Sequence, residues 1–233
     1  MFDPTITLLL ITALVSAFNP YTTGVLILLC SVIYGRGHKP SRVIGLGIAY
    51  IATLFLASVL GGILILYLCS LLPMIAMNYL VLGIGILVVC AGLLEVKDFF
   101  WYGQGLSMGV PRIAATNIRA LTKTRSHLGS AIALGLFVAF IVTPSSSAPY
   151  FATVTALRGE FNVGTISLLV FYTAIFCLPM IAMLLALGNG LKVSTLLRWK
   201  EETKQAFRLG VGLLLIALGW LLILIANGVV NIG

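Results

Sequence analysis

Six long apolar runs make up most of this chain, and they restrict its fold more than any other feature. A helix needs about 20 apolar residues to cross the hydrocarbon core of a bilayer, and the runs have about that length or more. They occupy Thr5–Tyr34, Val43–Leu72, Met77–Leu94, Gly129–Leu157, Val163–Leu187 and Phe207–Val230. Only 9% of the residues are charged, whereas charged residues make up about 25% of soluble globular domains. The sequence therefore predicts an all-α integral membrane protein with six transmembrane helices.

The basic residues predict the orientation of these helices. Of the 14 Lys and Arg residues, all except Arg158 lie in or beside alternate connections between the runs. These residues are Arg36, Lys39, Arg42, Lys97, Arg112, Arg119, Lys123, Arg125, Lys192, Arg198, Lys200, Lys204 and Arg208. Basic residues near helix ends are retained on the cytoplasmic side, so we expect a multi-pass protein with both termini outward. The net charge of +8 then reflects topology and contact with the anionic lipid bilayer, and nothing indicates a nucleic-acid partner.

The second half of the chain repeats the first at a nearly constant spacing, which indicates an internal duplication. Pro20 and Pro144 are 124 residues apart, and Tyr50 and Tyr172 are 122 apart. Three glycine pairs share a spacing of 127 residues, namely Gly83 with Gly210, Gly85 with Gly212 and Gly92 with Gly219. Since each half holds three helices, the two copies must cross the membrane in opposite directions. We expect inverted three-helix repeats at 1–95 and 129–233, joined by a cytoplasmic interfacial segment at 96–128.

Two proline-centred motifs interrupt the first and fourth runs near their middles. Proline removes a helical hydrogen bond and frees a carbonyl, here that of Ser16 or Phe140, for which hydrocarbon offers no donor. Hydroxyl-bearing residues surround both prolines, so we expect helices 1 and 4 to be broken and to form a substrate-binding site at the membrane centre. The candidate site residues are Asn19, Pro20, Tyr21, Thr22, Thr23, Thr143, Pro144, Ser145, Ser146, Ser147 and Pro149.

The chemistry expected at this centre is neutral. The central thirds of all six runs contain no Asp, Glu, Lys, Arg or His, so a proton relay or carboxylate-based sodium coupling is not expected there. The four cysteines lie singly on four helices without metal-ligand spacing, and we expect them to be small core residues. No metal site and no cofactor are predicted.

The segment from Val96 to Leu128 is the longest stretch between the runs. It opens with the aromatic sequence Phe99-Phe100-Trp101-Tyr102, which suits the headgroup boundary. After Pro111, apolar and basic residues alternate in a pattern that favours a short amphipathic helix on the cytoplasmic surface. A membrane anchor is the simpler interpretation, and a docking site for a soluble partner is the alternative.

The paired motifs resemble those of the transmembrane thiol-reductant family typified by the cytochrome c biogenesis protein CcdA and the membrane domain of DsbD. That family has two inverted halves, with Asn-Pro-Cys or Ser-Pro-Cys in helix 1 and Pro-Cys-Thr-x-x-Pro in helix 4. Here the motifs read Asn19-Pro20-Tyr21-Thr22-Thr23-Gly24 and Thr143-Pro144-Ser145-Ser146-Ser147-Ala148-Pro149-Tyr150. The segment Glu95-Val96-Lys97-Asp98-Phe99-Phe100-Trp101-Tyr102-Gly103 is similar to one in a prokaryotic branch of the family. The resemblance covers essentially the whole chain and implies a prokaryotic cytoplasmic (inner) membrane.

The two positions that are catalytic cysteines in the family are occupied here by Tyr21 and Ser145. Thiol–disulfide exchange needs a thiolate and a second sulfur, so the resemblance implies a chain that is redox-inactive as written. With motif cysteines, the implied partners would be cytoplasmic thioredoxin and an outward-facing thiol acceptor.

Two other functions suit the sequence. The first is an alternating-access carrier that moves a small neutral solute or a cation through the hydroxyl-lined centre. The second is a non-catalytic assembly factor that holds a partner on the 96–128 segment. Whether the chain is an enzyme therefore stays open at this point.

Overall fold

The structure, a computed structural model, describes residues 4–17, 20–35, 37, 39–101, 127–142, 150, 161–189, 191 and 193–228. Over these ranges it is helical and contains no strand. The helices are α1 (Pro4–Ala17), α2 (Pro20–Gly35), α3 (Pro40–Ser70), α4 (Met74–Phe100), α6 (Leu128–Phe137), the π-helix η1 (Val138–Val142), α9 (Val163–Gly188) and α10 (Val193–Ala226). In these ranges, α3, α4, α9 and the Arg208–Ala226 part of α10 are long and apolar enough to cross a membrane.

The first apolar run forms two helices rather than one. α1 ends at Ala17 and α2 begins at Pro20, so the interruption expected at this proline is present. Pro20 is the first residue of α2, a position at which proline's fixed φ and missing N–H are tolerated. In the fourth run, α6 gives way to η1, which ends at Val142, directly before the second motif. π-Helical turns of this kind are often found at functional sites.

Two helices extend further than the apolar runs predicted. α4 continues through Phe100, so residues 96–100 belong to this helix and not to the connecting segment. α10 begins at Val193, well before the predicted start at Phe207. The first half of α10 is rich in Lys, Arg, Glu and Gln, which are good helix formers but carry no apolar signal. The surface helix expected after Pro111 lies outside the described residues.

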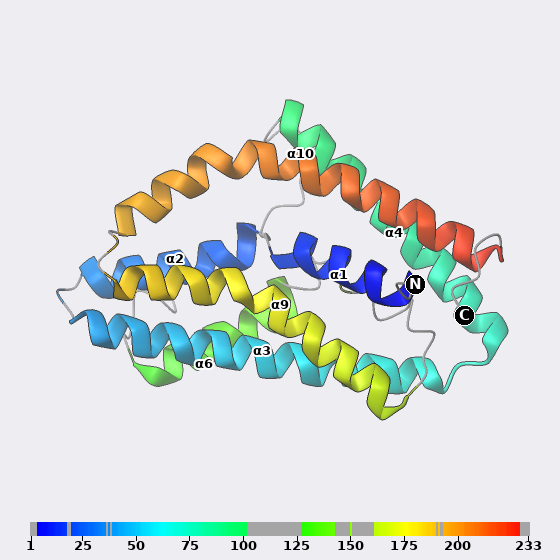
Figure 1. Cartoon of the computed structure of the whole chain (residues 1–233), viewed down its shortest axis with the longest axis horizontal. Coiled ribbons are helices and arrows are strands. Elements are labelled where there is room, and N and C mark those ends of the chain that lie inside the picture. Colours follow the sequence, from blue (N-terminus) through cyan, green and yellow to red (C-terminus); the bar gives the residue numbers. More distant parts are fainter. Residues whose placement is uncertain are drawn as a thin grey trace.

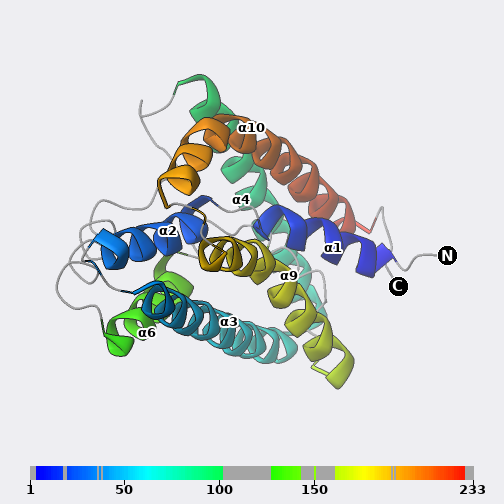
Figure 2. The same cartoon turned by 60° about the vertical axis from the view of Figure 1, so that its left-hand side comes forward.

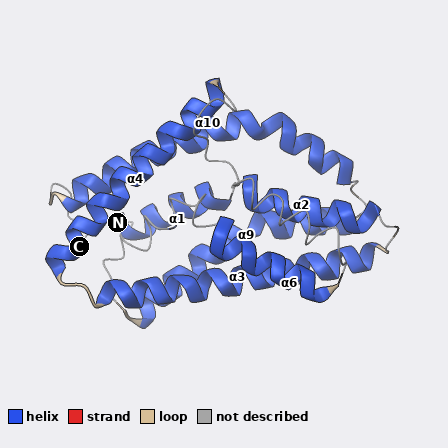
Figure 3. Ribbon diagram, turned by 180° about the vertical axis from the view of Figure 1, so that it is seen from behind, coloured by secondary structure: helices blue, strands red, loops and turns tan. Residues whose placement is uncertain are grey.

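The helices form two groups. One is the crossing pair α4–α10, and the other contains α1, α2, α3, α6 and α9. α1 and α2 lie nearly end to end through the middle of the molecule, with α3 and α9 along one side and the crossing pair α4–α10 along the other (Figure 1). The turned view and the view from behind keep this separation (Figures 2 and 3). α3 packs on α9 and α6, α1 packs on α9, and α10 packs on α4 and α2. α1 begins and α10 ends at the same end of the molecule (Figure 1).

Three apolar clusters fill these contacts. The largest joins α2, α3, α6, η1 and α9, and a second joins α1, α3 and α9 with Tyr150. The third lies between α4 and α10, and Cys69 at the end of α3 also belongs to it. The α4–α10 pair thus has its own core and is a distinct packing unit.

Glycines bring the backbones of α4 and α10 into contact. A Cβ atom on Gly92 would lie 2.7 Å from the carbonyl oxygen of Gly212, and one on Gly219 would lie 2.7 Å from that of Gly85. Both distances are too short for a real side chain, so only glycine allows this approach. Gly85 therefore meets Gly219 and Gly92 meets Gly212, which makes the crossing antiparallel.

The α3–α9 contact is built from glycine and leucine. Leu184 occupies the space that a side chain on Gly47 would need, and Leu169 occupies the corresponding space at Gly62. Both leucines are almost fully buried. The missing side chains thus let the two long helices pack closely at two separate levels.

We predict that Gly92→Ala and Gly212→Ala each destabilise the protein by about 1–3 kcal/mol, because the new methyl group overpacks the helix crossing. Thermal or chemical unfolding in detergent micelles measures this loss. Gly83→Ala and Gly210→Ala are matched controls, since nothing lies within 4 Å of the Cβ position at either residue. Equal effects in the two sets would contradict the close backbone crossing.

Candidate functional site: buried hydroxyl groups at a helix interruption

The described part of the first motif lies at the break between α1 and α2. Pro20 and Tyr21 form the start of α2. Thr22 is fully buried and Thr23 is 7% exposed, so the predicted hydroxyls of this motif face the protein interior. Six other candidates, together with Ser145, lie in ranges outside the described residues: Asn19, Thr143, Pro144, Ser146, Ser147 and Pro149.

Two tyrosines hold the two sides of this break. The Tyr172 hydroxyl on α9 lies 2.5 Å from Oγ of Ser16, the last residue but one of α1. The Tyr50 hydroxyl on α3 donates to the carbonyl oxygen of Thr22, just after the break, at 3.2 Å. Both tyrosines are essentially buried. Because hydrocarbon offers no partner to polar groups at a broken helix, these hydroxyls supply partners from within the protein.

Tyr150 connects the end of the second motif to the same region. It follows Pro149 directly in the sequence, and its hydroxyl donates to the carbonyl oxygen of Ser58 at 2.6 Å. Its ring packs against that of Tyr172, with 5.7 Å between the centroids. Since Tyr172 also contacts Ser16, one chain of contacts joins Tyr150, the last residue of the second motif, to Ser16 at the end of α1.

Contacts on the other side of the second motif lead to α2. η1 packs against α2, and Val138 of η1 belongs to the same apolar cluster as Leu26 and Leu29 of α2. η1 and Tyr150 are the described segments on either side of 143–149. η1 contacts α2, the helix after the first break. Tyr150 lies in a cluster with Leu9 and Ala13 of α1, the helix before that break.

Buried hydroxyl groups surround this region. Thr12 and Thr173 are each about 1% exposed, and Ser16 is 3% exposed. The hydroxyl of Ser58 is buried and makes no hydrogen bond within the described ranges. A buried polar atom without a partner is costly, so Ser58 is suited to receive a hydrogen bond from water or a solute.

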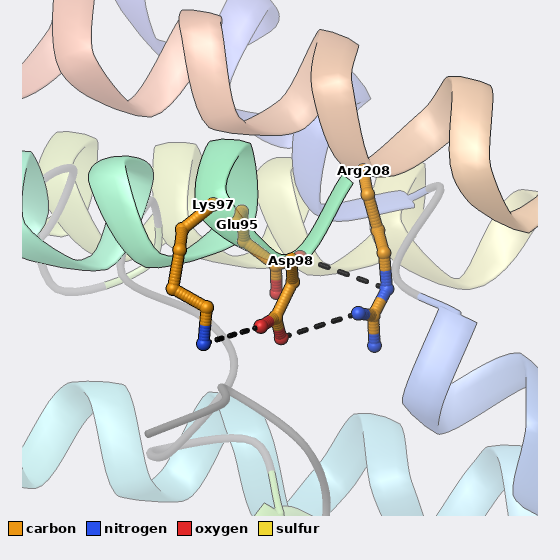
Figure 4. A network of polar contacts seen from close by, with 4 residues as sticks. All are labelled: Glu95, Lys97, Asp98 and Arg208. Carbon is orange, nitrogen blue, oxygen red and sulfur yellow. Dashed lines mark hydrogen bonds and ion pairs between the residues drawn. The ribbon is translucent and has the colours of Figure 1, made fainter. Parts of the chain in front are cut away.

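A cluster of charged residues is buried between α4 and α10. The Arg208 guanidinium donates to Asp98 Oδ2 at 3.2 Å and lies 3.9 Å from Glu95 Oε2, while Lys97 Nζ lies 3.0 Å from Asp98 Oδ1 (Figure 4). The side chains of Asp98 and Arg208 are 0% and 2% exposed. Two positive and two negative groups balance each other, which is the condition for burying charges in a low-dielectric interior.

Sequence reasoning did not identify this cluster. In the sequence, Glu95 is the last residue before the connecting segment, and Arg208 is 110 residues away from Asp98. Nothing in the hydropathy pattern predicts that α10 turns Arg208 toward α4. Ionisable residues inside a membrane protein are functional candidates by default. These residues lie at or just beyond the ends of the apolar runs, outside the central thirds for which neutral chemistry is predicted.

No disulfide joins the described cysteines. Cys30, Cys69 and Cys177 are buried among apolar side chains, whereas Cys90 is exposed, and all four are free thiols. Within the described ranges no group of His, Cys, Asp and Glu is arranged to hold a metal ion. The chemistry of the described interior is therefore that of hydroxyls, carbonyls and one balanced charge cluster.

Comparison of this chain with protein-family models, with curated proteins and with solved structures gives no match. Its resemblance to the thiol-reductant family therefore rests on the motifs alone and stays a prediction.

We predict that Tyr172→Phe lowers the stability by about 1 kcal/mol, because it removes a buried hydroxyl and leaves Ser16 without this partner. Unfolding in detergent micelles measures the change. Tyr67→Phe is the matched control, since Tyr67 is 48% exposed on α3. If both variants behave like the unmodified protein, the bond to Ser16 does not hold the break.

We predict that Arg208→Met destabilises the protein by about 3–5 kcal/mol, because it leaves two buried carboxylates with less compensating charge. The triple variant Arg208→Met/Glu95→Gln/Asp98→Asn should recover most of that loss, since it removes the three buried charges together and leaves only Lys97, whose side chain is 29% exposed. Arg198→Met, at an exposed residue of the same helix, serves as the control. A triple variant as unstable as Arg208→Met would contradict a role for charge balance.

Proposed function

We propose that this protein is an alternating-access carrier that moves a small, neutral, hydrogen-bonding solute across a membrane. The observation that carries this proposal is the chain of contacts from Ser16 through Tyr172 to Tyr150. It supports a common centre for the two proline motifs, lined by hydroxyls and located about halfway along the long helices. Carriers built from broken helices bind their substrates at such a midplane position.

Two sets of contacts support an inverted repeat as the scaffold. At a spacing of 127 residues, Gly85 corresponds to Gly212 and Gly92 corresponds to Gly219. The repeat therefore pairs the contact Gly85–Gly219 with the contact Gly212–Gly92, and both contacts are present. At a spacing of 122 residues, Gly47 corresponds to Leu169 and Gly62 corresponds to Leu184. The contact Gly47–Leu184 is thus paired with the contact Leu169–Gly62, and both are again present. The packing of α1 on α9 matches that of α6 on α3. A two-fold axis in the membrane plane relates contacts in this way, which favours six helices in two inverted halves.

The charge distribution favours a neutral solute over an ion. The buried groups around the break are hydroxyls and carbonyls, namely those of Ser16, Thr22, Thr23 and Ser58 with Tyr50 and Tyr172. The only charged cluster in the described interior contains two acidic and two basic side chains. It therefore offers no net charge to attract an anion or a cation. Polyols, small amides and similar solutes fit a site that gives and accepts hydrogen bonds.

The two packing units suggest which parts move. α4 and α10 share their own core and meet the other helices mainly through α2 and the end of α3. Rocking of this pair against α1, α2, α3, α6 and α9 would open the centre to one side and then the other. The basic turn between α2 and α3 lies at the end opposite to the start of α1 (Figure 1). With positive residues inside, this arrangement favours outward termini, and the family resemblance implies a prokaryotic cytoplasmic membrane.

Thiol–disulfide electron transfer is the function implied by the family resemblance. The family's cysteine positions are Tyr21 and Ser145 here, and a phenol or an alcohol cannot form a disulfide. We therefore propose that this chain shares the helical scaffold of that family and not its thiol chemistry. Measuring the reduction of an outward-facing thiol acceptor in vesicles distinguishes the two functions, and we expect no activity.

We predict that Thr22→Val and Ser146→Ala each abolish solute counterflow in proteoliposomes, because each removes a hydroxyl from the proposed centre. A panel of labelled polyols and amides identifies a transported solute with the unmodified protein first. Ser167→Ala is the control, since this exposed serine only bonds its own helix at the Val163 carbonyl. Wild-type counterflow in both hydroxyl variants would refute this site.

A further inference from the structure

An open groove of about 850 Å³ lies between α3 and α9, apart from the hydroxyl centre. Its floor is formed by the buried residues Ile51, Cys177 and Leu184, and its rims by exposed apolar residues such as Ile48 and Leu178. Almost every lining side chain is apolar. The volume is within the range of ligand-binding clefts, but in a bilayer this open side faces hydrocarbon and not water.

The groove has the length of one lipid leaflet. On α3 its lining runs from Ile44 to Leu56, which is about 18 Å at a rise of 1.5 Å per residue. The hydrocarbon core is about 30 Å thick, so the groove extends a little further than one leaflet. At the Ile44 end of the groove α3 and α9 lie close together, since the Cβ position of Gly188 is 3.1 Å from the Ile44 side chain.

Positive charge lies in the sequence just before the Ile44 end of the groove. Lys39 and Arg42 are exposed residues at the start of α3, within about a turn of Ile44. Ser41 between them is also exposed and carries a hydroxyl. Gly37, with a φ of 74°, forms the turn that directs the chain from α2 into this basic helix start. Anionic headgroups are attracted by about 1 kcal/mol for each such basic residue.

From these observations we propose that the groove is a binding site for one anionic phospholipid, with an acyl chain between α3 and α9 and the phosphate at Lys39 and Arg42. The length of the groove matches a single leaflet, and the charge at its end selects the headgroup. A neutral lipid fits the apolar part equally well but gains nothing from the basic pair. This proposal does not depend on the carrier function.

Native mass spectrometry of the protein released from phosphatidylglycerol/phosphatidylcholine nanodiscs tests the site. We expect one phosphatidylglycerol to be retained per chain. The double variant Lys39→Gln/Arg42→Gln should lower its preference over phosphatidylcholine by about thirtyfold, from two basic contacts. Ala174→Phe should displace both lipids, because Ala174 lines the groove.

Two variants provide the controls. Ala182→Phe adds the same ring at an exposed residue of α9 that does not line the groove, and Arg198→Gln removes an exposed basic residue elsewhere. Both should retain phosphatidylglycerol. Equal retention of the two lipids by the unmodified protein would overturn the proposal, as would unchanged retention in Ala174→Phe. A dimer that Ala174→Phe dissociates would instead assign the groove to a second copy of the chain and would also overturn it.

Discussion

Hydrocarbon offers no hydrogen-bond partner to the polar groups beside a helix interruption in a bilayer, so those groups, side chains included, depend on the protein for one. The break between Ala17 and Pro20 lies beside two long, continuous helices. Each of these contributes one buried tyrosine, and the two hydroxyls bond on opposite sides of the break, at Ser16 and at Thr22. The interruption is therefore held in place by rigid neighbours and can present polar groups at a fixed position.

The placement of those tyrosines depends in turn on close helix packing. α3 and α9 approach each other where Gly47 and Gly62 leave room for leucine side chains. α4 and α10 approach each other through backbone contacts between glycines. Because membrane helices gain little from the hydrophobic effect when they associate, such small-residue contacts supply much of their packing. The fold thus consists of one unit that contains the break and a second unit that lies against it.

Much of this architecture follows from the sequence, because hydropathy and proline act locally. The long apolar helices agree with what the apolar runs predict, and α1 and α2 are separate helices on either side of the first motif's proline. The repeat spacing also predicts that Tyr50 and Tyr172 are equivalent residues. Their roles at the break were not predictable, since a spacing does not say which group a hydroxyl will reach.

Other features depend on packing that no local pattern encodes. The polar first half of α10 is helical, although an apolar run begins only near Phe207. The contact between Arg208 and Asp98 brings together residues from the two halves of the chain. The apolar groove between α3 and α9 requires both helix faces at once, and each face alone resembles any lipid-facing surface. Charge clusters and grooves are properties of helix pairs, which is why single-run reasoning does not identify them.

The proposed transport centre requires the two proline motifs to meet, and intramolecular cross-linking measures their proximity most directly. In a variant without the four native cysteines, Thr23→Cys and Ser146→Cys are introduced together and treated with a short bifunctional maleimide in proteoliposomes. If the motifs share one centre, we expect efficient cross-linking within one chain. We expect none when Thr23→Cys is combined with Ser70→Cys at the exposed end of α3. Failure of the Thr23–Ser146 pair to cross-link, with each cysteine reacting singly, would contradict a shared centre.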